Sequence, residues 1–152
     1  MLKKIISGAQ TGADRGGLDF AIKIGLDHGG WCPKGRHAED GTIPRCYNVQ
    51  ETQDSGYNQR TSFNVRDSDG TVIFGMTGEP ETPGSKLTVT LCQRYQKPCL
   101  YLSPHSSDPG RELWDFIIIH SIETLNVAGS RASKAPEIAQ FVHKVLVDAL
   151  LT

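Results

Sequence analysis

The chain has 152 residues, a formal net charge of -1, and 38% hydrophobic against 22% charged residues. This composition is typical of a globular protein rather than a disordered or fibrous one, and the length predicts a single domain over residues 1–152. A nearly neutral chain lacks the clustered basic charge of a nucleic-acid-binding domain, so neither DNA nor RNA is expected as a partner.

The N-terminal part of the chain predicts a strand, a glycine-rich loop and a helix. The apolar residues within Leu2 to Ile6 indicate a short strand. From Arg15 to Leu26, apolar residues recur at the spacing i, i+3, i+4 and i+7, which predicts a helix with one buried face. The segment from Asp27 to Gly56 has little periodicity and is interrupted by glycine and proline. We therefore expect a long structured loop there, with one short strand near Gly30 to Cys32.

Strands and helices alternate in the rest of the chain. Thr71 to Phe74 is a continuous apolar run, typical of a parallel strand that is covered on both faces. The next elements are expected as helix, strand, helix, strand and closing helix, at Ser85 to Tyr95, Cys99 to Leu102, Arg111 to Ile122, Thr124 to Val127 and from Pro136 onwards. This alternation predicts an α/β fold with a mainly parallel sheet between two layers of helices.

Ligands of such sheets bind beyond the carboxyl ends of the strands, where three loops have suitable residues. The first, Gly8 to Gly17, combines glycines, which let a backbone approach a ligand closely, with the free N–H groups of a helix start, which favour an anion. Its spacing matches neither a Walker A loop nor the dinucleotide fingerprint. A tight turn capped by Asp14, with Arg15 in solvent, is the structural alternative.

Two later loops repeat this chemistry. Gly84-Ser85-Lys86-Leu87-Thr88 places a glycine, a hydroxyl and a cation at a helix start. Gly129 to Ser133 places the Arg131 guanidinium at a third strand end, where it could pair with a phosphate or carboxylate. Each could also be only a cap or a surface loop, but together the three loops favour a phosphate site.

Other candidates for chemistry are less specific. Trp31 to Arg36 offers an aromatic ring and two cations, which equally suit a packed Trp beside a basic turn. The irregular spacing of Cys32, His37 and Cys46 does not favour zinc, so no metal site is expected. No serine has the context of a nucleophile elbow. Four carboxylates could act as a general acid or base at the strand ends: Asp14, Asp19, Glu79 and Glu81.

The chain also carries signals about location and assembly. The first apolar run is too short for a signal peptide, and no later run is long enough to span a membrane. The four cysteines form no C-x-x-C pair and are expected as free thiols, so we expect a cytoplasmic protein without a membrane partner. Apolar helices that flank a sheet often pair between subunits, which makes a homodimer or higher homo-oligomer one expectation.

The sequence resembles the molybdenum carrier proteins, the circularly permuted YpsA group of the SLOG superfamily. The matching runs cover most of the chain in order: GAQTGADRGGLDFA (Gly8 to Ala21), GGWCPKGRHAEDGTIP (Gly29 to Pro44), YNQRTSFNVRDSDGTVIF (Tyr57 to Phe74), PGSKLT (Pro83 to Thr88) and NVAGSR (Asn126 to Arg131). The resemblance implies a Rossmann-like, three-layer α/β/α fold that binds a nucleotide or the molybdenum cofactor (molybdopterin), a phosphorylated pterin.

The resemblance also implies which residues bind the ligand. Gly8, Gln10, Thr11, Gly12, Asp14 and Arg15 would form the first binding loop, Gly84, Ser85 and Thr88 the second, and Gly129 and Arg131 would close the site. The last loop of the family usually reads Asn-Val-Ala-Gly-Pro-Arg-Glu-Ser, so Ser130 and Ala132 depart from it. The Pro-Gly-Gly-x-Gly-Thr-x-x-Glu motif of relatives that cleave nucleoside monophosphates is replaced here by Pro83-Gly84-Ser85-Lys86-Leu87-Thr88.

These observations favour a protein that binds a phosphorylated small molecule over an enzyme. Backbone amides of the Gly8 and Gly84 loops would hold the phosphate, Arg15 and Arg131 would neutralise it, and Thr11 and Ser85 would donate hydrogen bonds to its oxygens. Gln10 or Asp14 would contact a sugar or ring edge. The alternatives are a nucleotide-metabolising enzyme, such as a nucleoside monophosphate glycosidic-bond hydrolase, and a sensor of a nucleotide signal.

Overall fold

A computed structural model that describes residues 1–152 has a five-stranded parallel sheet with strand order β2-β1-β9-β7-β8. The chain forms a Rossmann-like α/β fold, which confirms the fold class expected from the sequence. The strands of this sheet are β1 (Lys4–Ile6), β2 (Asp27–Gly29), β7 (Gly70–Phe74), β8 (Cys99–Leu102) and β9 (Thr124–Gly129). The helices are α1 (Ala13–Ile24), α2 (Tyr57–Arg66), α3 (Pro83–Arg94), α4 (Pro109–Ile119) and α5 (Ile138–Leu150).

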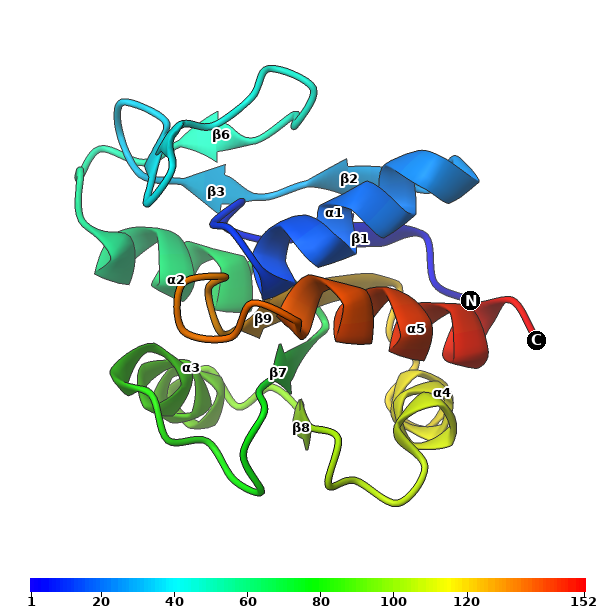
Figure 1. The fold of residues 1–152 in the computed structure, drawn as a ribbon. Helices are drawn as coiled ribbons and strands as arrows, with labels where there is room; N and C mark the ends of the chain where they lie inside the picture. The colour runs from blue at the N-terminus through cyan, green and yellow to red at the C-terminus, as the bar shows by residue number, and fades with distance from the viewer.

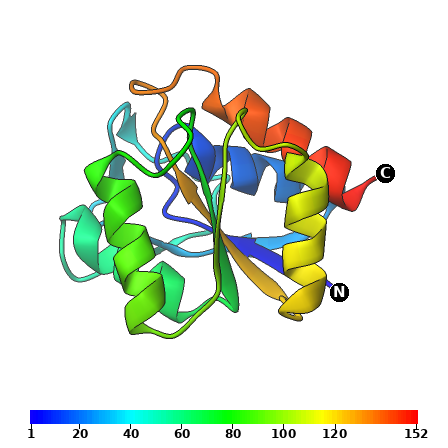
Figure 2. The same ribbon diagram turned by 90° about the horizontal axis from the view of Figure 1, so that it is seen from below.

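Helices cover both faces of the sheet (Figures 1 and 2). Helices α1, α4 and α5 pack together on one face, and α2 packs beside α3 on the other. The chain runs from β1 through α1 to the edge strand β2, and from β7 through α3 to the opposite edge strand β8. The loops after β1 and β7 diverge on either side of β9, which opens a crevice at the carboxyl ends of these strands.

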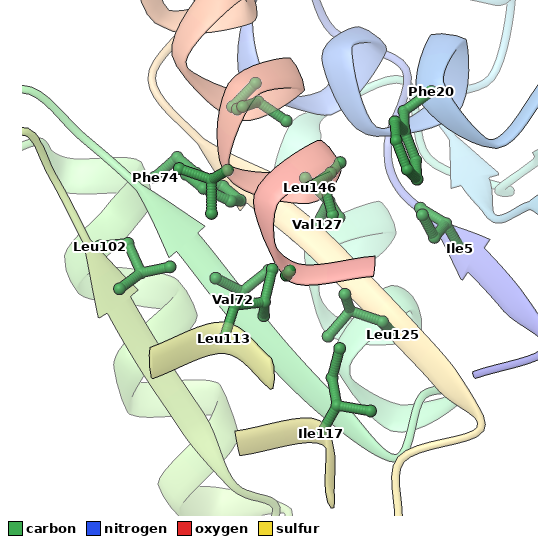
Figure 3. Packing of buried hydrophobic residues seen from close by; sticks show 14 of the residues in the cluster. Ile5, Phe20, Val72, Phe74, Leu102, Leu113, Ile117, Leu125, Val127 and Leu146 are labelled. Carbon is green, nitrogen blue, oxygen red and sulfur yellow. The ribbon is translucent and has the colours of Figure 1, made fainter. Parts of the chain in front are cut away.

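The main hydrophobic core lies between the sheet and the layer of α1, α4 and α5. Figure 3 shows Val72 and Leu125 of the central strands facing Leu113 and Ile117 of α4 and Leu146 of α5. Each of these five side chains is at most 2% exposed. Their removal from water is the main contribution that holds α4 and α5 against the sheet.

The segment from Asp27 to Gly56 is more ordered than a loop with one short strand. In addition to β2, it contains the parallel pair β3 (Trp31–Cys32) with β6 (Gln50–Glu51) and the antiparallel pair β4 (His37–Ala38) with β5 (Gly41–Thr42). The Arg36 guanidinium donates hydrogen bonds to the carbonyls of Ile43, Pro44, Tyr47 and Val49. The Arg36 side chain thus satisfies carbonyl groups that would otherwise need strand pairing. Because these contacts come from one arginine and not from alternating apolar residues, the sequence shows no periodic pattern here.

Helix α2 was not expected from the sequence. Only Asn64 and Val65 of its ten residues are buried, so it lacks the apolar stripe by which a helix is recognised. The other helices occupy the expected regions with shifted ends: α1 begins at Ala13 rather than Arg15, and α4 ends at Ile119 rather than Ile122. No helix in the structure has both the length and the apolar composition needed to span a membrane.

Two isoleucines of α4 provide a test of this packing. Ile117 is 2% exposed against the sheet, whereas Ile119 is 73% exposed. We expect Ile117→Ala to lower the free energy of unfolding by about 2–5 kcal/mol, because it removes buried methyl groups and leaves a cavity. The same substitution at Ile119 is expected to change it by no more than about 0.5 kcal/mol. Urea denaturation of both variants measures the difference, and equal losses would contradict the assigned face of α4.

Candidate functional site

A cavity of about 540 Å³ lies at the carboxyl ends of the central strands. The β1–α1 loop, α2, the start of α3 and the β9–α5 loop form its walls. Of the sequence-predicted site residues, the cavity brings together Gly8, Gln10, Asp14, Gly84, Ser85, Thr88, Gly129 and Arg131. Thr11, Gly12 and Arg15 do not line it. The cavity wall also includes Arg60, Thr61, Asn64, Thr82, Asn126 and Lys134, which sequence reasoning did not assign to the site.

A buried ion pair joins the first loop to α2. The Oδ2 atom of Asp14 accepts a hydrogen bond from Arg60 Nη1 at 2.8 Å and another from the Gln10 N–H at 3.3 Å. The side chains of Asp14 and Arg60 are only 8% and 12% exposed. Burial raises the pKa of Asp14, and the Arg60 guanidinium acts in the opposite direction. The pair therefore gives a buried carboxyl in the cavity wall a cationic partner that offsets part of the cost of its desolvation.

The absence of a side chain at Gly8 leaves space for this ion pair. A Cβ atom at residue 8 would overlap the Arg60 guanidinium, so a side chain there would move Arg60 away from Asp14. At Gly129, φ is +146° and an added Cβ would overlap the Phe74 carbonyl oxygen. In contrast, a Cβ at Gly84 would meet no atom within 4 Å. Backbone contacts thus require the glycine at 129, the glycine at 8 leaves room for the Arg60 side chain, and space beside Gly84 stays open.

Other donors of the first loop are also used within the protein. The Ala13 N–H at the start of α1 donates to the Ser130 carbonyl at 3.0 Å. The Thr11 hydroxyl donates to the Glu39 carboxylate and accepts the Ala132 N–H at 3.1 Å. The N-terminus of α1 is therefore less available to a ligand than its glycine-rich sequence indicates.

The β4–β5 hairpin fixes the outer side of this loop. Arg15 donates two hydrogen bonds to the Asp40 carboxylate, at 2.6 and 2.8 Å, and its Nε–H donates to the Ala9 carbonyl at 3.0 Å. The Glu39 carboxylate accepts hydrogen bonds from the backbone N–H and hydroxyl of Ser133, at 3.1 and 2.6 Å, which together with the bond from Thr11 lower the pKa of Glu39. Arg15 consequently points toward the hairpin and away from the cavity.

The start of α3 is the most accessible place for an anion. Thr82 caps the helix by accepting the Ser85 N–H at 3.1 Å, and Pro83 follows at the first helical position. The residue Ser85 is 6% exposed and lines the cavity, but its hydroxyl makes no hydrogen bond within the protein. The Thr88 hydroxyl, by contrast, donates to the Gly84 carbonyl at 2.9 Å. A cavity-lining hydroxyl beside a helix N-terminus can donate to an anionic ligand.

Three cations surround the cavity. The guanidinium groups of Arg60 and Arg131 lie 5.0 and 5.6 Å from the centroid of the Tyr57 ring, a separation that allows cation–π attraction. Lys134 is exposed on the β9–α5 loop and forms no ion pair. Arg60 and Tyr57 belong to α2, so they were missed together with that helix. The matching run Tyr57 to Phe74 was the one sequence signal that could have identified them.

Gln10 presents a buried donor without a partner. Its Oε1 atom accepts the N–H groups of Thr11 and Glu39, at 3.1 and 2.9 Å, which fixes the orientation of the amide. The opposite atom, Nε2, is buried and forms no hydrogen bond. In Asn64, both side-chain polar atoms bind the backbone of Trp31, at 2.8 and 3.0 Å. Gln10 therefore has an unused donor in the cavity wall, whereas Asn64 is a structural residue.

The four carboxylates that were candidates for acid–base chemistry are separated by the fold. Only Asp14 lines the cavity. Asp19 instead accepts the hydroxyl of Tyr47 at 2.6 Å, and the burial of that hydroxyl raises the pKa of Tyr47. Glu79 and Glu81 are exposed on the loop before α3.

Ser130, one of the two residues of the last loop that depart from the family pattern, forms a backbone hydrogen bond. The Ser130 N–H donates to the Phe74 carbonyl at 3.0 Å, a hydrogen bond that a proline at this position could not donate. The loop thereby gains a backbone link to the end of β7.

A second hollow, of about 650 Å³, lies between the two chain ends and the contact of α4 with α5. Its lining is mainly apolar and includes Leu26, Trp114 and Leu150. No residue of the three predicted binding loops lines it.

The Asp14–Arg60 pair generates a pH-dependent prediction. Arg60→Met leaves the buried carboxylate unpaired, which should raise the pKa of Asp14 further. In the unfolded chain the Asp14 carboxyl loses its proton near pH 3.9, whereas in the folded variant it keeps the proton to a higher pH. The free energy of unfolding of the variant therefore falls as the pH rises from about 3.9 to the pKa of Asp14 in the folded variant. We expect a loss of about 3–5 kcal/mol at pH 8 and a smaller loss at pH 5, measured by urea denaturation.

Arg111→Met is the matched control, because Arg111 pairs with Asp115 at 3.0 Å but both side chains are exposed. Its expected effect is at most about 1 kcal/mol at either pH. If Arg60→Met had a similarly small effect, or lowered the free energy of unfolding equally at both pH values, the buried pair would be contradicted.

Comparisons with known proteins identify the family of the chain. The model of the Circularly permutated YpsA SLOG family matches residues 5–150. A crystal structure from Syntrophus aciditrophicus SB, described as a "putative molybdenum carrier protein", is 45% identical, with a TM-score of 0.93 over 98% of this chain and 95% of that chain. A search of curated proteins gave no match. Because the family model spans nearly the whole sequence, the chain belongs to the circularly permuted YpsA family of SLOG proteins.

Proposed function

We propose that the cavity binds a phosphorylated small molecule, either the phosphorylated pterin of the molybdenum cofactor or a nucleotide. The observation that carries this proposal is the unpartnered Ser85 hydroxyl at the N-terminus of α3, inside a cavity whose rim holds Arg131 and Lys134. A volume of about 540 Å³ lies within the range of small-molecule sites, roughly 300–1,000 Å³. The size therefore suits a ligand of this class.

The phosphate is assigned to the α3 side of the cavity rather than to the first loop. Ser85 would donate its hydroxyl, and the start of the helix would add the positive end of its dipole. The open space beside Gly84 allows a close approach to the backbone. Arg131 and Lys134 would neutralise the charge from the neighbouring loop, and the guanidinium offers a two-pronged contact to phosphate oxygens.

This assignment changes the roles expected from the sequence. Arg15 and Thr11 would shape the first loop through Asp40 and Glu39 instead of touching the phosphate. Gly8 would support the binding site by leaving space for Arg60. The residues proposed to contact the phosphate are thus Gly84, Ser85, Arg131 and Lys134, with Thr88 holding the first turn of α3.

The carrier name of the 45% identical crystal structure supports a bound cofactor. The residues present also fit the phosphorylated pterin of that cofactor, because its phosphate would match the Ser85 end and the orphaned Gln10 Nε2 is a spare donor for a polar ring. When bound, the cofactor would supply its molybdenum chemistry to an acceptor enzyme. This chain's residues would hold the phosphate and the ring and shield them from water.

Mass spectrometry of the molecules released from gently purified, then denatured protein tests the proposal. We expect about one pterin phosphate or nucleotide per chain. Incubation with common nucleotides followed by product chromatography is expected to return them unchanged, as a binding protein requires. An empty protein that also binds no nucleoside monophosphate or pterin phosphate in calorimetry would contradict the proposal.

Lys134→Ala and Lys144→Ala form a matched pair of variants. Lys134 lines the cavity, whereas Lys144 lies on α5 outside it and is 3.9 Å from Asp148. Hydrogen bonds to charged groups contribute about 1.5–3 kcal/mol, so we expect Lys134→Ala to weaken binding of the released ligand by roughly 10–100-fold. Lys144→Ala should leave the dissociation constant, measured by calorimetry, unchanged. Equal changes of the dissociation constant in the two variants would contradict the placement of the phosphate in this cavity.

A further inference from the structure

Two groups on the β1 side of the cavity are not explained by phosphate binding. The Oδ2 atom of Asp14 accepts the hydrogen bonds from Arg60 and Gln10, but its Oδ1 atom accepts none. The Nε2 atom of Gln10 is a donor with no partner, and its orientation is fixed by the two bonds at Oε1. The β1 side therefore offers one free acceptor and one free donor from the same loop.

The Asp14 carboxylate rules out a second phosphate at this side. Like charges repel strongly in a site of low dielectric constant, so the group that faces Asp14 is not an anion and carries N–H or O–H donors. The unpartnered Gln10 Nε2 beside it calls for an acceptor on the same group, and a neutral polar group has both. Strand β9 lies between β1 and β7, which places the β1 side about two inter-strand spacings, roughly 10 Å, from the α3 side. The ligand that fills both sides has a phosphate at one end and a neutral polar group at the other.

We propose that this neutral group is a 2-amino-4-oxopyrimidine ring, as found in both guanine and pterins. The ring N–H and the amino group would donate to Asp14 Oδ1, and the oxo group would accept from Gln10 Nε2. Adenine offers an unprotonated ring nitrogen on the corresponding edge, which would face the lone pairs of the carboxylate. Asp14 and Gln10 are thus specificity-determining residues of the site. This inference rests on the proposed function and narrows its ligand class.

Arg60 acts on this selection as a positioning residue. Its 2.8 Å contact engages Oδ2 and leaves Oδ1 without a partner, and its charge favours the ionised carboxylate that would accept from the ring. The space that Gly8 leaves open is what allows the guanidinium to reach this position.

Calorimetry with four ligands tests the inference on the unmodified protein. The probes are GMP, IMP, AMP and the phosphate of 6-hydroxymethylpterin. GMP or the pterin phosphate should bind at least about tenfold more tightly than AMP, because each unpaired buried polar group costs about 1–3 kcal/mol. IMP keeps the ring N–H but lacks the 2-amino group, so its affinity should lie between those of GMP and AMP.

Asp14→Asn extends the test, with Asp19→Asn as its control because Asp19 does not line the cavity. Asp14→Asn should reduce the ratio of GMP affinity to AMP affinity at least about tenfold. Asp19→Asn should leave all four affinities unchanged. The relative affinities for GMP and the pterin phosphate distinguish the two sources of the ring.

Two results would overturn the inference in different ways. Equal affinity for AMP and GMP, together with no tighter binding of the pterin phosphate, would reject ring selection while leaving phosphate binding intact. A failure of all four probes to bind would reject both ring selection and the proposed function. The wild-type ligand series decides between these results even if Asp14→Asn does not fold.

Discussion

The buried ion pair of Asp14 and Arg60 is the interaction on which the candidate site depends. It joins residues 46 positions apart and binds the first turn of α1 to α2, a helix with few apolar residues of its own. Burying two charges is costly unless each finds a partner, so neither side chain has a favourable position without the other. The contact links α2 to the start of α1, uses the space that Gly8 leaves open, and engages Asp14 Oδ2 while Oδ1 has no partner.

The sheet topology decides which chemistry meets in the cavity. Because β9 lies between β1 and β7, loops that are distant in sequence become opposite walls of one crevice. One wall carries a carboxylate and an amide, and the other carries a helix N-terminus and a hydroxyl. A cavity with such different walls suits a ligand with two chemically distinct ends better than a simple anion.

Much of the fold was predictable because it rests on local patterns. The apolar run of Thr71 to Phe74 and the helical spacing in α1, α3 and α5 reflect burial against the sheet, which the sequence records directly. Helix α2 and the short strands after β2 leave no such record. Arg36 and the Asp14–Arg60 pair stabilise them through polar contacts with distant residues, which have no period in the sequence.

The sequence by itself determined the α/β class, the family and the three loops that meet at the strand ends. Only the tertiary structure decided what each side chain in these loops does. Arg15, the arginine expected at the phosphate, turns to Asp40, whereas Arg60, outside every predicted loop, enters the cavity wall. The physical reason is that a charged side chain takes its direction from the nearest partner in space, and that partner here comes from a distant part of the chain.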